Sequence, residues 1–357
     1  MNHRRAAAPL AAMLTMLIFL VPVAGSPARA GHSGSRQSVA AGGCQLSGSI
    51  AEFPLPRSDA QPKSIVSRPD GGLWFTEFAA DAIGYVHGFS GTHPDITELT
   101  APPIAGAFID APSTLASGPV GSVWFTDPFA GAIRRLSAQG QFTTFPIPSA
   151  GGIPGGIVEG PDNNLWFTDF SGDAIGRLTP SGRFTEFPTP TAGSEPFSIA
   201  RGPDNGLWFT ESKAGKIGRI STDGRTREFR LPGNLEAPVS ITTGPDNDLW
   251  FTADRSNAIG RLSVRGALQH YAIPSAHSGP GDISLGADGN LWFTEARANR
   301  IGCITSRGHV SEFAIPTPNS NPSGIAAGQG RTMWFTETAG NKLGLITLAP
   351  PQLPASR

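Results

Sequence analysis

A Trp-Phe-Thr tripeptide recurs seven times along this chain of 357 residues and contains every tryptophan in it. From the second copy onward the tryptophans follow one another at 42 residues, five times in succession, and only the first interval, of 50 residues, is longer. A fixed period of this size indicates an array of similar supersecondary units. The tryptophans are Trp74, Trp124, Trp166, Trp208, Trp250, Trp292 and Trp334.

Each unit contains four short runs of strand-forming residues, separated by turns rich in glycine, proline and aspartate. In the fourth unit the runs are 196–200, 207–211, 216–221 and 226–229. The turn after the first run is Gly-Pro-Asp-Asn-Gly, in which proline presets φ and Asn or Gly accepts a positive φ. Leu207 and Phe209 lie on one face of the second run and Trp208 on the other, so the sheet needs a neighbour on each side. The chain is predicted to be all-β, a seven-bladed β-propeller with four-stranded antiparallel blades.

The last unit lacks a fourth strand, because its third run, 342–347, leads directly into Pro350 and Pro351. Residues 48–56 match the fourth strand of another unit, 184–190. We therefore predict that this N-terminal strand completes the last blade and closes the ring. The propeller then spans residues 48–348, and residues 349–357 form a C-terminal tail.

The first 30 residues have the three parts of an export signal. Arg4 and Arg5 precede an apolar run over residues 10–24, and Ala28-Arg29-Ala30 matches a cleavage site. We predict a signal peptide at 1–30 and a flexible leader at 31–47. The mature chain is then secreted or periplasmic, with no membrane span after cleavage.

The charge of the mature chain argues against a nucleic-acid partner. Without the signal peptide, 24 basic residues stand against 28 acidic ones, which gives a net charge of −4. There is no basic run. The expected partner is a small molecule, a peptide or a component of the cell envelope.

Two cysteines, Cys44 and Cys303, would lie in an oxidising compartment. They either form a disulfide that pins the leader to the sixth unit or remain two free thiols. The spacing alone leaves both alternatives open, because a bridge depends on the separation of the two Cα atoms.

Six units carry an acid directly after Trp-Phe-Thr: Glu77, Asp127, Asp169, Glu211, Glu295 and Glu337. A residue that repeats with the blade is expected to support the blade, for example by accepting hydrogen bonds. The alternative is a ring of carboxylates around the central channel that holds Mg²⁺ or Ca²⁺.

No two histidines have metal-ligand spacing, and there is no nucleophile motif of the Gly-x-Ser-x-Gly type. His277 lies in the loop expected nearest the face that carries sites in propellers. His277 is therefore the alternative candidate for a catalytic histidine. The other interpretation is that it is a solvated loop residue.

Three stretches of the repeat, 160–169, 173–179 and 184–190, resemble the virginiamycin B lyase family, also called streptogramin lyases. The resemblance covers residues 48–348. It implies a monomeric seven-bladed propeller. In active members it also implies a Mg²⁺-assisted β-elimination that opens a cyclic depsipeptide antibiotic at its ester bond.

The resemblance also implies site positions. The family's loop is of the Glu-Pro-His-Gly-Ile type, in which Glu binds the metal and His is the general base. A second metal-binding Glu ends the next Trp-Phe strand, and a histidine one blade earlier contacts substrate. Counted from the C-terminus, Asn321 stands at the first metal position, Ser323 at the base, Gly281 at the substrate histidine and Glu337 at the second metal position.

The other units do not supply the missing base. The residues at the equivalent position after the proline are Lys63, Ser113, Gly155, Phe197, Val239, Gly281 and Ser323. Glu195 and Glu211 keep both acids of the pattern and form an alternative metal cluster. A neutral serine cannot remove an α-proton without a partner base.

Three hypotheses therefore remain for the function. The first is a lyase-like propeller that binds a ligand or partner at the channel mouth without the family's chemistry. The second is an active Mg²⁺-dependent carbon–oxygen lyase that opens cyclic depsipeptide antibiotics, or a hydrolase, using other residues on the same face. The third is a structural or envelope interaction module, because a fold alone does not determine a function.

Overall fold

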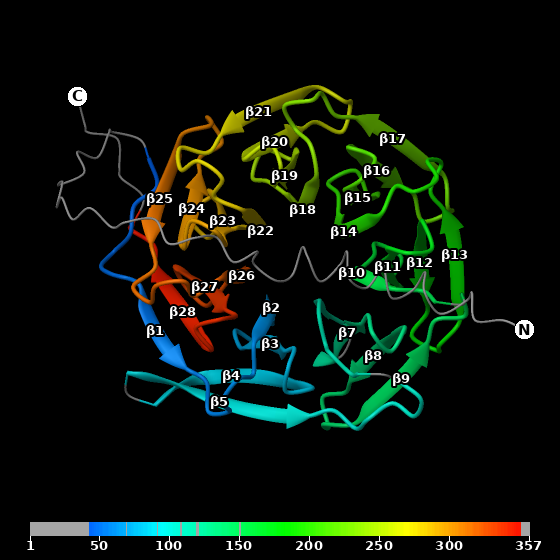
Figure 1. Cartoon of the computed structure of the whole chain (residues 1–357), viewed down its shortest axis with the longest axis horizontal. Coiled ribbons are helices and arrows are strands. Elements are labelled where there is room, and N and C mark those ends of the chain that lie inside the picture. The colour runs from blue at the N-terminus through cyan, green and yellow to red at the C-terminus, as the bar shows by residue number, and fades with distance from the viewer. Residues whose placement is uncertain are drawn as a thin grey trace, which may run out of the picture.

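Seven four-stranded sheets form a closed ring (Figure 1). The computed structural model describes residues 43–350 except residues 69, 91, 108, 119, 120 and 150. The predicted signal peptide, residues 31–42 of the predicted leader and residues 351–357 of the predicted tail lie outside the described residues. Within the described residues no helix is long and apolar enough to cross a membrane. The predicted seven-bladed propeller is confirmed.

In the first six blades the strands follow chain order from the innermost to the outermost. Blade 1 consists of β2 (Pro62–Ser67), β3 (Leu73–Glu77), β4 (Ala82–Ser90) and β5 (His93–Thr100). Blade 2 consists of β6 (Leu115–Ser117), β7 (Val123–Asp127), β8 (Ala132–Leu136) and β9 (Phe142–Pro146). Blade 3 consists of β10 (Pro154–Glu159), β11 (Leu165–Asp169), β12 (Ala174–Leu178) and β13 (Phe184–Pro188). Blade 4 consists of β14 (Pro196–Arg201), β15 (Leu207–Glu211), β16 (Lys216–Ile220) and β17 (Thr226–Arg230). Blade 5 consists of β18 (Pro238–Thr243), β19 (Leu249–Ala253), β20 (Ala258–Leu262) and β21 (Leu268–Ala272). Blade 6 consists of β22 (Pro280–Leu285), β23 (Leu291–Glu295), β24 (Arg300–Ile304) and β25 (Val310–Ala314). The long β4–β5 hairpin accounts for part of the longer first interval between tryptophans.

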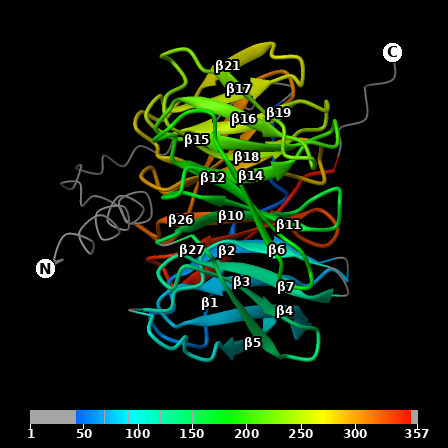
Figure 2. The ribbon, with the colours of Figure 1, turned by 90° about the vertical axis from the view of Figure 1, so that its right-hand side faces the viewer.

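Threonine hydroxyls join the innermost strands of neighbouring blades. In blade 4 the Ser198 N–H donates to Thr210 Oγ1 at 3.0 Å, and Thr210 Oγ1 donates to the carbonyl of Val239 in blade 5 at 2.9 Å. The described residues make the second bond at six of the seven blade junctions. Innermost strands such as β10 and β14 therefore lie side by side, as both views show (Figure 2).

The repeated tryptophan is buried and packs against the fourth strand of its own blade. Trp166 stacks on Phe187 with 5.5 Å between the ring centroids, and its Nε1 donates to Asp162 in the preceding turn at 2.9 Å. Asn163 in that turn has a φ of 58°, a region that asparagine and glycine tolerate best. Burial of one tryptophan contributes at most roughly 4–6 kcal/mol to folding.

The N-terminal strand closes the ring, as predicted. β1 (Ala51–Pro54) pairs antiparallel with β28 (Lys342–Thr347), which continues the seventh blade outward from β26 (Pro322–Ala327) and β27 (Thr332–Glu337). Figure 1 shows blue β1 beside red β28. The contact begins earlier than predicted, because the Ser47 N–H donates to the Thr347 carbonyl at 2.7 Å.

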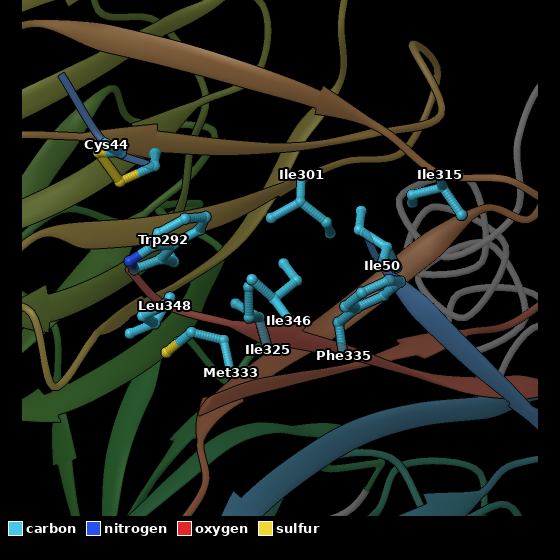
Figure 3. Close-up of a cluster of buried hydrophobic side chains, with 11 residues drawn as sticks. Cys44, Ile50, Trp292, Ile301, Ile315, Ile325, Met333, Phe335, Ile346 and Leu348 are labelled. Carbon is cyan, nitrogen blue, oxygen red and sulfur yellow. A yellow bond between two sulfur atoms is a disulfide. The ribbon is translucent and has the colours of Figure 1, made fainter. Parts of the chain in front are cut away.

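A disulfide joins Cys44 to Cys303, with 6.2 Å between the Cα atoms. Cys303 pairs with Trp292 across β23 and β24, and Figure 3 shows the Cys44 disulfide beside the Trp292 ring in a buried cluster. Residues 43–47, assigned to the leader, therefore lie against blades 6 and 7. The cross-linked residues are 259 positions apart, and a loop of that length constrains the unfolded chain by roughly 5 kcal/mol in a chain-entropy treatment.

Deletion of residues 31–56 should lower the thermal midpoint strongly, by roughly 10 °C or more. The variant loses β1, its hydrogen bonds to β28 and the disulfide together, so the outer edge of blade 7 is left unpaired. Thermal unfolding followed by circular dichroism measures the change. Deletion of residues 31–42 alone is the matched control, and equal midpoints for the two truncations would contradict this role of β1.

Candidate functional site

The seven innermost strands surround an axial cavity of 740 Å³. Every blade contributes residues from the start of its first strand, and Asp254, Ala296 and Arg297 contribute from the loops. Arg297 Nη2 and Asp254 Oδ1 form an ion pair at 2.5 Å within this lining. The threonine bonds position this wall, because each holds one innermost strand by its backbone N–H and the next by a carbonyl.

Three of the site positions implied by the resemblance lie together in the wall of this cavity: Asn321, Ser323 and Gly281. Ser323 and Gly281 are at equivalent positions on the neighbouring strands β26 and β22, and the Ser323 carbonyl accepts a bond from Thr294 at 2.9 Å. Asn321 precedes β26 and has a φ of 54°. These residues offer a hydroxyl, an amide and backbone groups, and no side chain that titrates near neutral pH.

The repeated acids do not form a ring around the cavity. All six are fully buried, and none of them lines the cavity. In four blades the acid meets a glutamate of the outermost strand, and burial, reinforced by that glutamate, raises its pKa. The pairs are Glu77 with Glu98, Glu211 with Glu228, Glu295 with Glu312, and Glu337 with Glu52. The alternative of a carboxylate ring that holds Mg²⁺ or Ca²⁺ in the channel was wrong.

Blade 2 has no glutamate pair and uses a buried arginine instead. Arg134 Nη1 lies 3.4 Å from Asp127 Oδ2 and 3.7 Å from Asp81 Oδ1, and its Nη2 bonds the Pro102 carbonyl. Burial raises the pKa of Asp127, which the Arg134 charge opposes. Asp127 accepts the Ala111 N–H at 3.2 Å and Asp169 the Ile153 N–H at 3.0 Å, so these two aspartates play the supporting role that the repeat indicated.

The residues at the implied Mg²⁺ positions do not fit the ion. Glu337 is fully buried and its pKa is raised to about 7 by burial and by the charge of Glu52. The same glutamate pair recurs in three other blades, so it is not specific to a metal position. Asn321 offers only a neutral carbonyl oxygen, whereas Mg²⁺ is usually held by carboxylates. Among the described residues no group of three His, Cys, Asp or Glu side chains is placed to hold a metal.

Glu195 and Glu211, the alternative metal cluster, have different partners. Glu195 Oε1 pairs with Lys213 Nζ at 2.8 Å, and the Glu195 carbonyl accepts the Ser212 N–H. Glu211 is buried inside blade 4, where burial and then the Glu228 charge raise its pKa to about 7. The structure thus brings the backbones of these residues together but directs their carboxylates to different neighbours.

His277 is exposed in the loop before β22, with a φ of 52°. Its carbonyl accepts a bond from Arg297 Nε at 3.1 Å. None of the described histidines lines the cavity. The structure therefore supplies no imidazole at the positions around Ser323.

Two cavity residues were missed in the search of the sequence for a histidine base. Lys63 occupies the same strand position as Ser323 one blade further on, and burial lowers the pKa of its amine to about 7. Asp282 bridges three innermost strands, because it accepts bonds from Ser240 Oγ at 2.7 Å and from the Ile325 N–H at 3.0 Å. Lys63 directly follows Pro62 and Asp282 lies two residues after Pro280, and this place near the start of a strand was the only signal available.

The free energy of unfolding should fall as the pH rises from about 5 to about 8. Burial raises the pKa of Glu77 and Glu295 to about 8 and of Glu211 and Glu337 to about 7, so the folded chain keeps protons that the unfolded chain releases above about 4.5. Hydrogen bonds from Thr317 and Lys342 lower the pKa of Glu52 despite its burial. The titration of Glu52 therefore changes the free energy of unfolding only at a pH below this window.

Urea unfolding at several pH values measures this dependence. Glu295→Gln replaces one titrating carboxyl by a side chain that is always neutral. The slope of the free energy of unfolding against pH should fall by the equivalent of up to about one proton over the window. Glu186→Gln changes an exposed glutamate of blade 3 and serves as the control. An identical slope in wild type and Glu295→Gln would refute this role of the buried carboxyl.

The sequence matches the Virginiamycin B lyase family over residues 34–190 and 103–351. A search of curated proteins finds no match. Among solved structures, a catalytically inactive histidine-to-alanine variant of virginiamycin B lyase from Staphylococcus aureus, with quinupristin, is 36% identical with a TM-score of 0.78, over 84% of this chain and 99% of that one. A streptogramin B lyase structure is 37% identical with a TM-score of 0.78, over 84% and 97%.

A third structure, hydrazine synthase from Kuenenia stuttgartiensis, shares the fold alone at 12% identity and a TM-score of 0.67, over 82% of this chain and 97% of that one. The two lyases differ from it in sharing more than a third of their residues with this chain over nearly their whole length. Their likeness agrees with the family match, which extends along the entire ring. The chain belongs to the virginiamycin B lyase family.

Proposed function

We propose that this chain is an exported, monomeric member of the family that binds a small molecule or a peptide at the axial cavity and does not open streptogramin lactones. The carrying observation is a ligand-sized cavity whose wall has Ser323 and Gly281 at the positions that the resemblance gives to histidines.

The volume and chemistry of the cavity support ligand binding. Its 740 Å³ lies within the range of roughly 300–1,000 Å³ that is typical of small-molecule sites. Apolar side chains such as Val239 and Ile283 alternate in its wall with the hydroxyls of Ser198, Ser240 and Ser323. This mixture suits a ligand with both an apolar body and hydrogen-bonding groups.

The absence of a base at Ser323 supports the loss of the family's reaction. Removal of an α-proton needs a positioned base with a pKa near the working pH, which contributes ~10²–10⁴-fold to the rate. One of the relatives is described as catalytically inactive after a single histidine-to-alanine change. The poor fit of Asn321 and Glu337 to Mg²⁺ also supports the loss of the family's reaction.

The purified mature chain should therefore leave a streptogramin B antibiotic intact in the presence of Mg²⁺. Mass spectrometry of the ring-opened product measures the reaction. Robust turnover by the unmodified chain would overturn the proposal and show that the base comes from elsewhere. Lys63, which lines the cavity and whose pKa burial lowers to about 7, would then be the first residue to mutate.

Restoration of the family residues tests the same point in the opposite direction. Asn321→Glu, Ser323→His and Gly281→His, together with the retained Glu337, restore all four implied positions, and turnover should rise by ~10²–10⁴-fold. A Cβ at Gly281 lies 2.8 Å from Thr294 Oγ1, so that hydroxyl must shift slightly. Five other blades carry a side chain at this position with the same threonine, which indicates that the shift is tolerated.

Binding without cleavage is the second expected outcome. Calorimetric titration with quinupristin, a ligand of one relative, should give a measurable affinity for the wild type. Val239→Trp fills part of the cavity and should weaken binding at least ~10-fold, about 1.4 kcal/mol. Ile109→Trp, on the exposed surface, is the control. Equal affinities for both variants would place the ligand outside the cavity.

A further inference from the structure

Asp282 gives the wall of the axial cavity a carboxylate at a level where every other blade has a small neutral residue. It is the second residue after the proline at the start of its strand, and it lines the cavity. The residues at the equivalent position in the other six blades are Ser64, Thr114, Gly156, Ser198, Ser240 and Gly324. The carboxylate is therefore a feature of this one blade and not of the repeat.

The carboxylate of Asp282 lies across the channel-facing edge of β22. Its Oδ1 accepts bonds from Ser240 Oγ of blade 5 at 2.7 Å and from the Ile283 N–H of its own strand at 3.0 Å. Its Oδ2 accepts the Ile325 N–H of blade 7 at 3.0 Å. Because β22 is the innermost strand of blade 6, a side chain that reaches both neighbouring blades passes in front of its own backbone. The carboxylate thus faces the lumen of the cavity.

The contact between the blades does not itself require a carboxylate. At the junction of blades 1 and 2 the Leu115 N–H donates to Ser64 Oγ at 3.2 Å, which is the bond that Ile325 makes with Asp282. A neutral hydroxyl therefore satisfies the same backbone group elsewhere in this ring. A charge taken out of water costs free energy that a hydroxyl avoids. The charge of Asp282 is more than the ring contact needs.

No cation of the protein compensates this charge. Among the residues that the structure describes, Asp282 forms no ion pair, and Arg297 of the same wall is bound to Asp254. Burial raises the pKa of the Asp282 carboxyl, and the three hydrogen bonds oppose this effect. A carboxylate has about four acceptor positions, so one remains for a further donor. An ammonium group would supply both that donor and the missing positive charge.

We propose that the axial cavity binds organic ammonium ions and that Asp282 anchors their charge. The ammonium N–H donates to the remaining acceptor position of the carboxylate, which Ser240 and the backbone of β26 hold in place. The apolar part of the ligand packs on wall side chains such as Val239 and Ile283. The inference rests on the proposed binding function of the cavity and names the class of ligand.

Two ligands of nearly the same shape test this preference on the intact mature chain. Cyclohexylammonium and cyclohexanol differ mainly in the charged group, and at pH 8 an alkylamine stays protonated, as an ordinary lysine does. Titration followed by the NMR signals of each ligand gives the dissociation constants. The amine should bind the wild type at least ~10-fold more tightly, because a charge-assisted hydrogen bond is the stronger one. Equal constants, or tighter binding of the alcohol, would overturn the proposal.

Variants assign the preference to one residue. Asp282→Asn removes the charge at nearly constant size, and Asp282→Ser reproduces the arrangement of Ser64. Both should reduce the preference for the amine to less than ~3-fold. Glu186→Gln removes a charge from an exposed position of blade 3 and should keep the full preference. An unchanged preference in both Asp282 variants, or the same loss in Glu186→Gln, would refute the anchor.

A third variant places the ligand. Val239→Trp fills part of the cavity and should weaken the binding of both ligands at least ~3-fold. Unchanged binding of the amine in this variant would place it outside the cavity and contradict the proposal. If the Asp282 variants do not fold, this result and the comparison of the two ligands on the wild type still decide the question.

The two proposals can fail separately. Quinupristin binding without a preference for cyclohexylammonium would reject the ammonium site and keep the binding function. A preference that depends on Asp282, without quinupristin binding, would keep the ammonium site, and the relative's ligand would then not be a ligand of this chain.

Discussion

The ring depends on one hydrogen-bonded residue, the threonine that follows Trp-Phe. Its hydroxyl accepts an N–H from the innermost strand of its own blade and donates to a carbonyl of the next blade, as Thr210 does between Ser198 and Val239. The hydroxyl is well suited to this position because it can donate and accept at the same time. The bond closes the ring as well, since Thr336 of the last blade donates to the carbonyl of Lys63 in the first.

This arrangement separates the fold from the chemistry of the cavity. The threonines hold the backbone at the residue that follows each proline, so its side chain is free to vary without loss of a ring contact. Lysine, serine, glycine, phenylalanine and valine all occupy that position in one chain. A propeller of this family can therefore lose one reaction and retain its architecture, because the residues that carry chemistry are not those that join the blades.

The sequence predicted the architecture well because its constraints repeat. Seven tryptophans at one spacing, a last unit without a fourth strand and a matching N-terminal segment lead to the closed ring. The placement of the acids was harder to predict, although the alternation of side chains along a strand contained a clue. Glu211 lies on the same face of its strand as Phe209 and on the face opposite to Trp208. Lys63 was missed because a pKa near 7 arises from three-dimensional burial. The sequence could not decide between a disulfide and two free thiols, because Cys44 and Cys303 approach each other only when the ring is closed.

The closing strand also sets an order of events during synthesis. Glu52 leaves the ribosome long before its partner Lys342, which lies 290 residues later in the chain. At ~5–20 residues per second, β1 waits for roughly 15–60 s before its partner strand exists. During that interval β1 is an unpaired edge, and the prolines at 54 and 56 together with the charge of Glu52 limit its pairing with other chains. The first strand to be made is thus among the last to dock, and ring formation is a late step of biogenesis.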